Sequence, residues 1–420
     1  MFLKKYLLKD KISIFILTLI FTFFIFGFFL RENSAGGGPL DLEHEWHNFN
    51  LLKKNFLNFL NVDYEASRFP LYHYLNIKIN HYIFDKKDFI NWFFLYSFLV
   101  PIFFYLALKY NFKNVPKYKI YLIVSLIFLS PFFRTSSYWG LQENLAYIFF
   151  FLSLISFQSS IKIIKKYLTI FLAFLSFYSD QKFLIIPVIY FFLFLGSSKQ
   201  ILKNFITNLR LVLFCFVLII PALLIFYKWG GISGPQGNKS ILKLDNVLVF
   251  IQLIAIYLLP VVIFQKDFFK KILNIFRIKN LLITISYLIF YFLIKNYFFI
   301  DDLPVGGGWS YKIYLLIKKN SLFFADLFYF FSSLFSFCLL LIYLNITKLN
   351  FIKIIILSYY IFLSLGINIL FQEYFDPIFN LMIIFYLNRN FFVNLSFLKL
   401  ILVNVYYFFF LISCIFFIVN

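Results

Sequence analysis

The sequence predicts an all-α polytopic membrane protein that crosses the bilayer about 13 times. Hydrophobic residues make up 62% of the 420 residues, and the mean hydropathy is +0.87, whereas soluble domains contain about 45–50% apolar residues. Long apolar runs recur along the chain between short charged segments, and runs of about 20 apolar residues cross a bilayer as helices. Lipid is therefore the solvent that most of the surface is expected to face.

The first expected span is residues 11–30, which are long enough to remain in the membrane as an anchor and do not form a convincing cleavable signal peptide. The later spans are apolar runs bounded by charged or turn residues. In chain order they are 89–108, 118–133, 144–159, 166–178, 183–196, 207–227, 246–264, 280–299, 321–343, 352–370, 376–388 and 399–419. Counted from the first span, the fifth (166–178), the sixth (183–196) and the twelfth (376–388) are short for a bilayer of roughly 30 Å. Re-entrant or partly inserted helices fit these three segments as well.

The charges between the spans predict a cytoplasmic N-terminus. If the Lys-rich start lies inside and the spans alternate, the inside segments contain 23 Lys and Arg residues and two acids, Asp10 and Asp267. The outside segments contain 15 basic and 15 acidic residues. This asymmetry follows the positive-inside rule, so the net charge of +21 indicates membrane topology and not nucleic-acid binding.

We expect a single transmembrane catalytic domain over residues 1–420, with an acidic motif in its first outside loop, residues 31–88. All four histidines lie in that loop: His44, His47, His73 and His81. Most other polar motifs also fall on the outside, including RTSSYWGLQEN, YSDQK, KWGGISGPQGNKS, DDLPVGGGW and QEYFDP. Because several polar loops share one side of the membrane, an extracytoplasmic active site at the membrane surface is expected.

The motif LDLEHEWH provides the expected catalytic base. If it begins a helix, Asp41 and Glu45 share one face, and Glu43 and His47 share another. A carboxylate at a helix N-terminus is held ionised by the helix dipole, as a general base requires. Asp41 or Glu43 is therefore the expected base, and Glu45, His44 and His47 are expected substrate contacts. A simple N-terminal cap with solvated acids explains the same motif equally well.

A sugar carried on a polyprenyl phosphate suits a site at the lipid surface. The glycine clusters at 36–38, 230–237 and 306–308 follow no predicted strand and match neither a P-loop nor a dinucleotide fingerprint, which disfavours a nucleotide-sugar donor. The tail of a lipid donor can lie between helices, and its phosphate is a good leaving group. Transfer then requires a base for the acceptor hydroxyl and cations for the departing phosphate.

Arg68, Arg134 and Lys182 are the candidate cations in the outside loops. Charged residues at such positions are costly unless they are paired or line a wet cavity, although interfacial snorkelling is a competing interpretation. The other expected substrate contacts are polar and aromatic residues of these loops: Tyr138, Gln142, Glu143, Asp180, Gln181, Glu373 and Tyr374. No cofactor is expected, and a divalent metal at His44 and His47 is left open.

At these motifs the chain resembles the multi-spanning glycosyltransferases of the GT-C superfamily, and within it the dolichyl-phosphate-glucose α-1,2-glucosyltransferases. The Asp-Glu-x-x-His motif in the first lumenal loop of that family is similar to Glu43 and His47, with Asp41 just ahead. The resemblance implies a membrane transferase whose sugar donor is carried on a lipid phosphate.

Four further motifs carry the resemblance. Pro70, Leu71 and Tyr72 are similar to the family's Pro-Gly-Leu-Tyr stretch. Gln181 is similar to the Gln of Arg-Gln-Thr-Asn, while Asp180 stands where that motif has Arg. The remaining similarities are Gly230 and Gly231 with Asn238, Lys239 and Ser240 to a Gly-Gly loop ahead of Asp-Lys-Ser, and Glu373, Tyr374 and Pro377 to an Arg-Tyr-x-x-Pro pattern.

The expected function is transfer of a sugar from a polyprenyl-phosphate-linked donor to a glycan or lipid-linked acceptor, by a general-base, inverting mechanism. The expected partners are donor, acceptor and membrane lipids, in a bacterial inner membrane or, for a eukaryote, the endoplasmic reticulum. A polymerase or ligase of lipid-linked glycans is the first alternative, but the longest loop comes early and favours the transferase. A transporter is the second, although only Lys295 and Asp326 approach the membrane interior.

Overall fold

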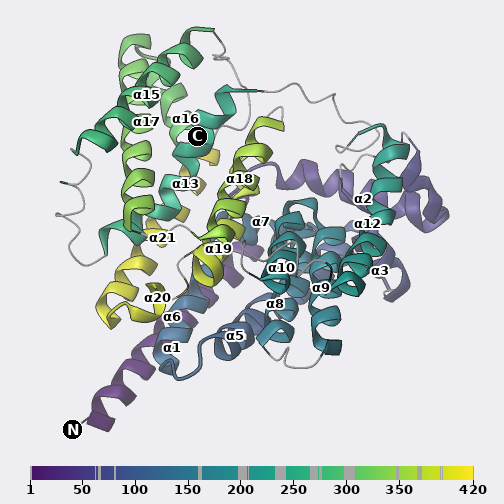
Figure 1. The fold of residues 1–420 in the computed structure, drawn as a ribbon. Helices are drawn as coiled ribbons and strands as arrows, with labels where there is room; N and C mark the ends of the chain where they lie inside the picture. Colours follow the sequence, from purple (N-terminus) through teal and green to yellow (C-terminus); the bar gives the residue numbers. More distant parts are fainter. Residues whose placement is uncertain are drawn as a thin grey trace. The chain divides into compact units, whose positions relative to one another are not determined.

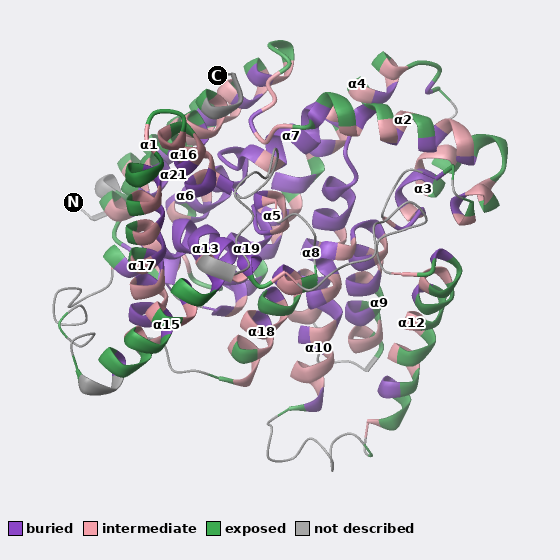
Figure 2. Cartoon of the chain, turned by 90° about the horizontal axis from the view of Figure 1, so that it is seen from above, coloured by how far each residue is buried: buried purple, intermediate pink, exposed green. Residues whose placement is uncertain are grey.

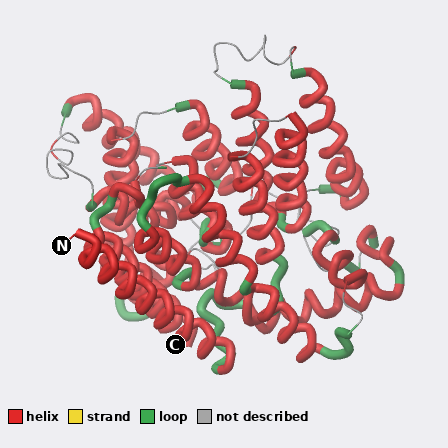
Figure 3. The backbone as a smooth tube through the Cα atoms, turned by 90° about the horizontal axis from the view of Figure 1, so that it is seen from below, coloured by secondary structure: helices red, strands yellow, loops and turns green. Residues whose placement is uncertain are grey.

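The computed structural model describes residues 2–61, 63–64, 68–79, 82–158, 163–196, 206, 208–231, 243–264, 273, 277–297, 308–346, 350–366, 371–387, 389 and 391–419. Every regular element within these ranges is a helix, as the tube in Figure 3 shows. The prediction of an all-α protein is therefore confirmed. The chain divides into two compact units, of which the first comprises 1–239 with 407–420 and the second comprises 240–406.

Within the described ranges, six helical segments are long and apolar enough to cross a membrane. They are Tyr6–Phe29, Lys86–Asn111, Leu209–Trp229, Asp245–Ile263, Leu322–Leu344 and Phe397–Phe416. A bent pair, Lys117–Phe128 with Pro131–Trp139, raises the number to seven if the pair is one span. Shorter apolar helices overlap four other expected spans: Glu143–Gln158, Gln181–Leu195, Asn280–Lys295 and Phe351–Gly366. These lengths and compositions fit a helical membrane protein.

The first unit contains the N-terminal half of the chain (Figure 1), including the loops that are expected on the outside. Its elements are α1 (Phe2–Phe29), α2 (Gly38–Lys54), η1 (Phe56–Leu60), α3 (Leu71–Ile79), α4 (Lys86–Ser97), α5 (Leu99–Asn111), α6 (Lys117–Phe128), α7 (Pro131–Trp139), α8 (Glu143–Gln158), α9 (Ile163–Ser179), η2 (Gln181–Leu184), α10 (Ile185–Leu195) and α12 (Leu209–Trp229). Helix α8 packs against α5 and α9, and it is buried along most of its length, whereas α12 exposes much of its surface (Figure 2).

The expected span at 118–133 is divided by a sharp bend. Helix α6 ends at Phe128 and α7 begins at Pro131, with 63° between their axes. The Ser130 hydroxyl accepts a hydrogen bond from the backbone N–H of Phe133, and Pro131 stands at the first helical position, where it needs no hydrogen-bond partner. Gly140 ends α7 with φ of 71°, a left-handed conformation that glycine adopts without strain. This local sequence therefore turns the chain at the start of the polar loop.

A buried ion pair links α7 to Glu32, which lies just after the C-terminal end of α1. The Arg134 side chain is fully buried, and its Nε donates to Glu32 Oε1 at 2.7 Å while Nη2 contacts Glu32 Oε2. The same guanidinium donates to the carbonyl oxygens of Phe128 and Phe23, at 3.2 and 3.1 Å. A Cβ at Gly27 would lie 2.5 Å from Arg134 Nη2 and from Glu32 Oε2, so the absence of a side chain there permits this approach. Arg134 is thus satisfied by protein groups on all sides.

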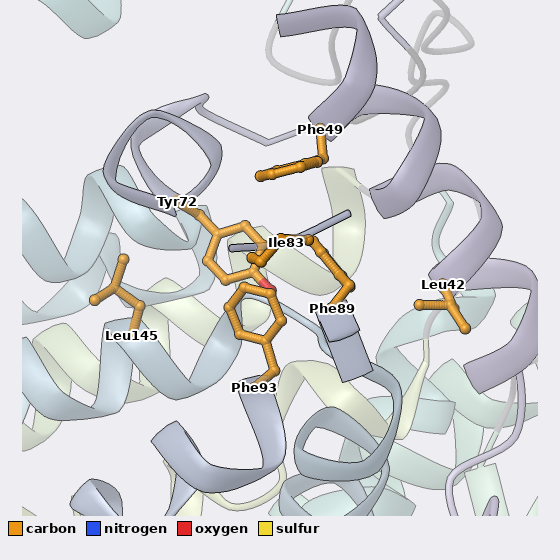
Figure 4. Packing of buried hydrophobic residues seen from close by; sticks show 7 residues of the cluster. All are labelled: Leu42, Phe49, Tyr72, Ile83, Phe89, Phe93 and Leu145. Atoms are coloured by element: carbon orange, nitrogen blue, oxygen red, sulfur yellow. The ribbon is translucent and has the colours of Figure 1, made fainter. Parts of the chain in front are cut away.

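Aromatic packing holds α2 and α3 against α4 and α8 (Figure 4). The buried cluster comprises Leu42, Phe49, Tyr72, Ile83, Phe89, Phe93 and Leu145, and Trp46 and Trp139 pack against it. The Tyr72 hydroxyl donates to the carbonyl oxygen of Gly140, which adds a polar link between α3 and the end of α7. A Cβ at Gly38 would lie 2.5 Å from the Trp139 ring, so α2 begins in close contact with α7. The segment 31–88, which is expected to be an outside loop, is thus largely helical where described.

The second unit is built around α13 (Asp245–Ile263), which is buried on almost every side and packs against α16, α17 and α18. The other elements are α15 (Ile278–Tyr297), α16 (Gly308–Lys318), α17 (Leu322–Ile346), α18 (Phe351–Gly366), η5 (Gln372–Tyr374), α19 (Ile378–Met382), the π-helix η6 (Ile383–Leu387), α20 (Phe391–Asn394) and α21 (Phe397–Val419), whose last residues belong to the first unit. Lys295 and Asp326, both near helix ends, form an ion pair of 3.0 Å between α15 and α17.

Replacing Arg134 by alanine is expected to lower the free energy of unfolding by about 3–5 kcal/mol, because Glu32 is left as a nearly buried, uncompensated charge. Denaturation of the purified protein in detergent, followed by circular dichroism, measures the change. Lys86→Ala is the control, since Lys86 and Glu43 form an exposed ion pair and such pairs contribute about 0–1 kcal/mol. Equal effects of the two substitutions would show that Arg134 is not the anchor.

Candidate functional site

Six charged or titratable side chains of the first unit meet in one largely buried cluster. They come from α2 (Glu45), the segment before α3 (Arg68), α3 (His73), the start of α8 (Glu143) and the short helix η2 with its N-cap (Lys182 and Asp180). The exposed fraction of the Arg68 side chain is 19%, and those of the other five are 8% or less. We call this set the charge cluster. Five of its six members were expected as site residues from the sequence.

Glu143 is the centre of the charge cluster. Its Oε1 lies 3.1 Å from Arg68 Nη1 and 3.0 Å from Lys182 Nζ, so two cations meet at one oxygen. Its Oε2 accepts a hydrogen bond of 3.3 Å from the Ser136 hydroxyl on α7. Lys182 Nζ also lies 3.4 Å from Asp180 Oδ2. Such a carboxylate is held by the donor types that proteins use to bind oxyanions.

The second half of the charge cluster lies on α2 and α3. Arg68 Nη1 is 3.8 Å from Glu45 Oε1, and Glu45 Oε2 is 3.0 Å from Nε2 of the fully buried His73. The Tyr64 hydroxyl donates to the backbone carbonyl of Arg68 at 2.9 Å and so fixes the segment that carries this arginine. The site is therefore assembled from parts of the chain that are more than 100 residues apart.

The helical period of α2 explains which acids enter the charge cluster. The buried residues of this helix recur at three- and four-residue intervals: Gly38, Leu42, Glu45, Asn48, Phe49 and Leu52. Asp41, one turn before Glu45, is half-buried near the helix N-terminus. Glu43 and His47 are exposed on the other face, where Glu43 pairs with Lys86 and His47 Nε2 lies 3.1 Å from the carbonyl oxygen of Asp63. The expected separation of the two faces is thus found.

Electrostatics within the charge cluster favour an ionised Glu143. This residue immediately precedes the expected span 144–159. Burial disfavours the charged form of Glu143. The nearby Lys182 and Arg68, together with hydrogen bonds to the carboxylate, outweigh this effect and lower the pKa of Glu143 to about 2. Burial raises the pKa of Asp180 despite the nearby Lys182 and Arg68. Among the described residues, the charge cluster contains three carboxylates and two permanent cations, Arg68 and Lys182. It therefore has no surplus positive charge, and one of its carboxylates can take up a proton.

The remaining predicted residues are distributed as follows. Tyr138 is buried, and its hydroxyl donates to the carbonyl oxygen of Phe24 at 2.5 Å, which makes it part of the packing between α1 and α7. Gln142 is fully buried next to Glu143, and Gln181 lies half-buried between the two η2 members of the charge cluster. His44 is half-buried on α2. Glu373 and Tyr374 are half-buried in η5 of the second unit.

Several other expectations have a simple outcome. Arg134, a candidate cation, is engaged by Glu32 and two carbonyl oxygens, as described above. Gly230 ends α12 in the left-handed conformation, with φ of 71°. His81, Asn238, Lys239 and Ser240 lie outside the described residues. Within the part of the chain that is described, no group of three or more His, Cys, Asp or Glu residues is arranged to hold a metal ion.

The sequence alone assigns no role to His73 or Ser136. His73 lies on α3 among apolar and aromatic residues, and no spacing in the sequence relates it to Glu45, 28 positions earlier. Ser136 lies within RTSSYW, where two adjacent serines look equivalent. Only the fold shows that the Ser136 hydroxyl bonds to Glu143, whereas that of Ser137 bonds to the carbonyl oxygen of Phe133.

An apolar groove shares the short helix η2 with the charge cluster. Its volume is about 250 Å³, and its lining residues come from α9, η2, α10 and α12: Phe174, Leu184, Pro187, Val188, Phe191, Phe192, Val212, Cys215, Phe216 and Ile219. Leu184 and Lys182 are both in η2, about 4 Å apart along its axis given the rise of a 3₁₀ helix. The groove and the charge cluster thus draw on the same turn of η2.

The low pKa of Glu143 predicts a pH-dependent contribution to stability. Because its folded pKa lies below the ordinary value of 4.5, the contribution is complete above about pH 5.5 and is lost as the pH falls from 4.5 towards 2. The difference in unfolding free energy between the wild type and Glu143→Gln should shrink over that range. Denaturation in detergent at several pH values measures it, and a difference independent of pH would contradict the assigned ion pairs.

The arrangement holds the Glu143 carboxylate between Arg68 and Lys182 in a largely buried position, and the apolar groove begins on the same short helix as Lys182. Asp41 adds a half-buried carboxylate one helical turn from Glu45, at a helix N-terminus that favours its ionised form. Scans against protein-family models, curated proteins and solved structures found no match for this chain.

Proposed function

We propose that the protein is a membrane glycosyltransferase with a GT-C-like architecture. It moves a sugar from a polyprenyl-phosphate-linked donor to a glycan or lipid-linked acceptor at the extracytoplasmic face. The proposed architecture has about 13 spans. If the N-terminus lies in the cytoplasm, seven of these spans run from the cytoplasm to the outside. The proposal also includes Glu373 and Tyr374 as contacts of the substrate.

The observation that carries the proposal is the convergence of Arg68 and Lys182 on one buried oxygen, together with an apolar groove that extends to η2, the short helix that contains Lys182. A phosphate that leaves a sugar develops negative charge, and guanidinium and ammonium groups in a water-poor site stabilise that charge. The groove offers apolar surface to a polyprenyl tail, and it contains almost no polar lining. Both features are needed for a lipid-linked donor, while a nucleotide-sugar donor needs no apolar groove.

In the proposed reaction, the oxygen of an acceptor hydroxyl attacks the anomeric carbon of the donor sugar. The base accepts the hydroxyl proton, the bond from the anomeric carbon to the phosphate oxygen breaks, and its electron pair leaves with the polyprenyl phosphate. Attack from the opposite side inverts the anomeric configuration. Arg68 and Lys182 stabilise the departing phosphate, and no residue has to protonate it.

Asp41 is the better supported of the two base candidates. It is on the side of α2 that carries Glu45, it is half-buried, and the helix N-terminus favours its charge. Glu43 lies on the exposed face and already pairs with Lys86. We therefore assign the base to Asp41, with Glu43 as the alternative that the next experiment distinguishes.

Asp41→Asn is expected to lower the transfer rate by about 10²–10⁴-fold, the usual contribution of a general base, without changing membrane insertion. Transfer from lipid-linked donors in membranes, normalised to the amount of inserted protein, measures this effect. Glu43→Gln is the matched comparison. Loss of transfer in Glu43→Gln with retention in Asp41→Asn would move the base to Glu43, and full activity of both variants would contradict the proposed base altogether.

The groove yields a separate prediction. Val188→Trp should fill it and raise the KM for a lipid-linked donor while changing kcat much less, because the tail is remote from the reacting atoms. Leu213→Trp is the control, since Leu213 lies on α12 beside the groove residue Val212 but is 54% exposed and outside the lining. Equal effects of the two substitutions on KM would remove the groove from the donor site.

The function as a whole is tested by mass spectrometry of lipid-linked and surface glycans from cells with and without the gene. Loss of one sugar from an otherwise normal glycan is the expected result, and it identifies the transferred sugar. Accumulation of single repeat units would indicate a polymerase or ligase instead. An unchanged glycan profile would contradict the transferase and favour transport.

A further inference from the structure

The anion position between Arg68 and Lys182 is filled by the protein itself. Glu143 Oε1 lies 3.1 Å from Arg68 Nη1 and 3.0 Å from Lys182 Nζ, and the Ser136 hydroxyl donates a hydrogen bond to Oε2. A guanidinium, an ammonium and a hydroxyl are the donors expected around a phosphate oxygen. Glu143 is 4% exposed, so a phosphate cannot approach the same donors closely while the ionised carboxylate keeps them.

The charge balance of the cluster makes simple addition of a phosphate unfavourable. Glu45, Glu143 and Asp180 outnumber Arg68 and Lys182, the permanent cations of the charge cluster, so one more buried negative charge would have no further permanent cation within the cluster to compensate for it. Burying an uncompensated charge costs several kcal/mol in proteins, and such groups take up a proton instead. A bound phosphate therefore requires the loss of one negative charge nearby.

We propose that Glu143 occupies the phosphate position in the unliganded protein and takes up one proton when a lipid phosphate binds to Arg68 and Lys182. The lipid part of this inference rests on the proposed function. On binding, a proton from solvent neutralises the Glu143 carboxyl, and the phosphate takes over both cations. When the phosphate leaves, the proton returns to solvent and the two ion pairs form again.

Glu143 is the group that best fits this exchange. The titratable and charged groups around it are Tyr64, Arg68, Tyr72 and His73 from the α3 side, Glu45 from α2, and Asp180 and Lys182 from η2. Asp180 contacts Lys182 at 3.4 Å and Glu45 contacts Arg68 at 3.8 Å, whereas Glu143 Oε1 contacts both cations, so a phosphate that takes over both cations displaces the Glu143 carboxylate. His73 approaches Glu45 and not Glu143.

Two measurable properties follow. The affinity for the phosphate should fall about tenfold for each unit of rising pH near pH 7, because one proton is bound with each ligand. Glu143→Gln should bind the phosphate more tightly at neutral pH, by about tenfold or more. The neutral amide does not compete with the phosphate for Arg68 and Lys182 as a carboxylate does. The variant therefore binds the phosphate without first taking up a proton.

The experiment is calorimetric titration of the purified full-length protein with farnesyl methyl phosphate, a lipid phosphodiester that does not itself titrate near pH 7. Measurement in buffers of different ionisation enthalpy gives the number of protons taken up. The expected result is about one proton per ligand for the wild type and about zero for Glu143→Gln, together with tighter binding by the variant. Asp326→Asn is the control for loss of an ion-paired carboxylate elsewhere, and it should behave as the wild type.

Binding by the wild type without proton uptake, at an affinity that Glu143→Gln does not change, would overturn the inference and leave the proposed transferase intact. Absence of binding to both proteins would overturn it as well, while the glycan profile judges the transferase separately. The wild-type proton count needs no substitution, so the test holds even if Glu143→Gln folds poorly.

Discussion

Burial of charge in an apolar protein is the constraint on which the structure of the first unit depends. Arg134 is fully buried and is compensated by Glu32 and by backbone carbonyl oxygens, which ties α7 to α1. In the charge cluster, Glu143 and its two cations compensate one another's buried charge where α2, α3, α8 and η2 meet. Removing one partner from either network leaves a charge that the surroundings cannot solvate. Helix positions and side-chain chemistry are therefore coupled.

The two networks differ in what they allow. In the first, Arg134 is held in the fixed geometry of a carboxylate and two carbonyl oxygens, so it serves as an anchor. In the second, the cations share the Glu143 carboxylate, and Asp180 lies close by. Uptake of a proton by one of these carboxylates changes the net charge of the cluster. The second network also shares the short helix η2 with the apolar groove, through Lys182 and Leu184. This combination makes the charge cluster a candidate for a lipid phosphate site, whereas Arg134 is not.

Much of this arrangement could be predicted from local sequence, and the rest could not. Apolar runs predicted the helices, and the spacing of Asp41, Glu43, Glu45 and His47 predicted the two faces of α2. The bend at Ser130 and Pro131 was missed because the apolar run continues across it. The partners of Glu143 were beyond reach, since Arg68 and Lys182 are 75 and 39 residues away along the chain. Pairing of charges over such distances is set by helix packing, which hydropathy does not encode.

A lipid phosphate site in the first unit is tested most directly by photochemical labelling with a farnesyl phosphodiester that carries a photoreactive group on its tail. We expect the label, mapped by peptide mass spectrometry, to concentrate in α9, η2, α10 and α12, whose side chains line the groove. We also expect Lys182→Gln, which removes a cation from the head-group site, to reduce this labelling. Label spread evenly over the apolar helices of both units, and insensitive to Lys182→Gln, would contradict a single lipid phosphate site.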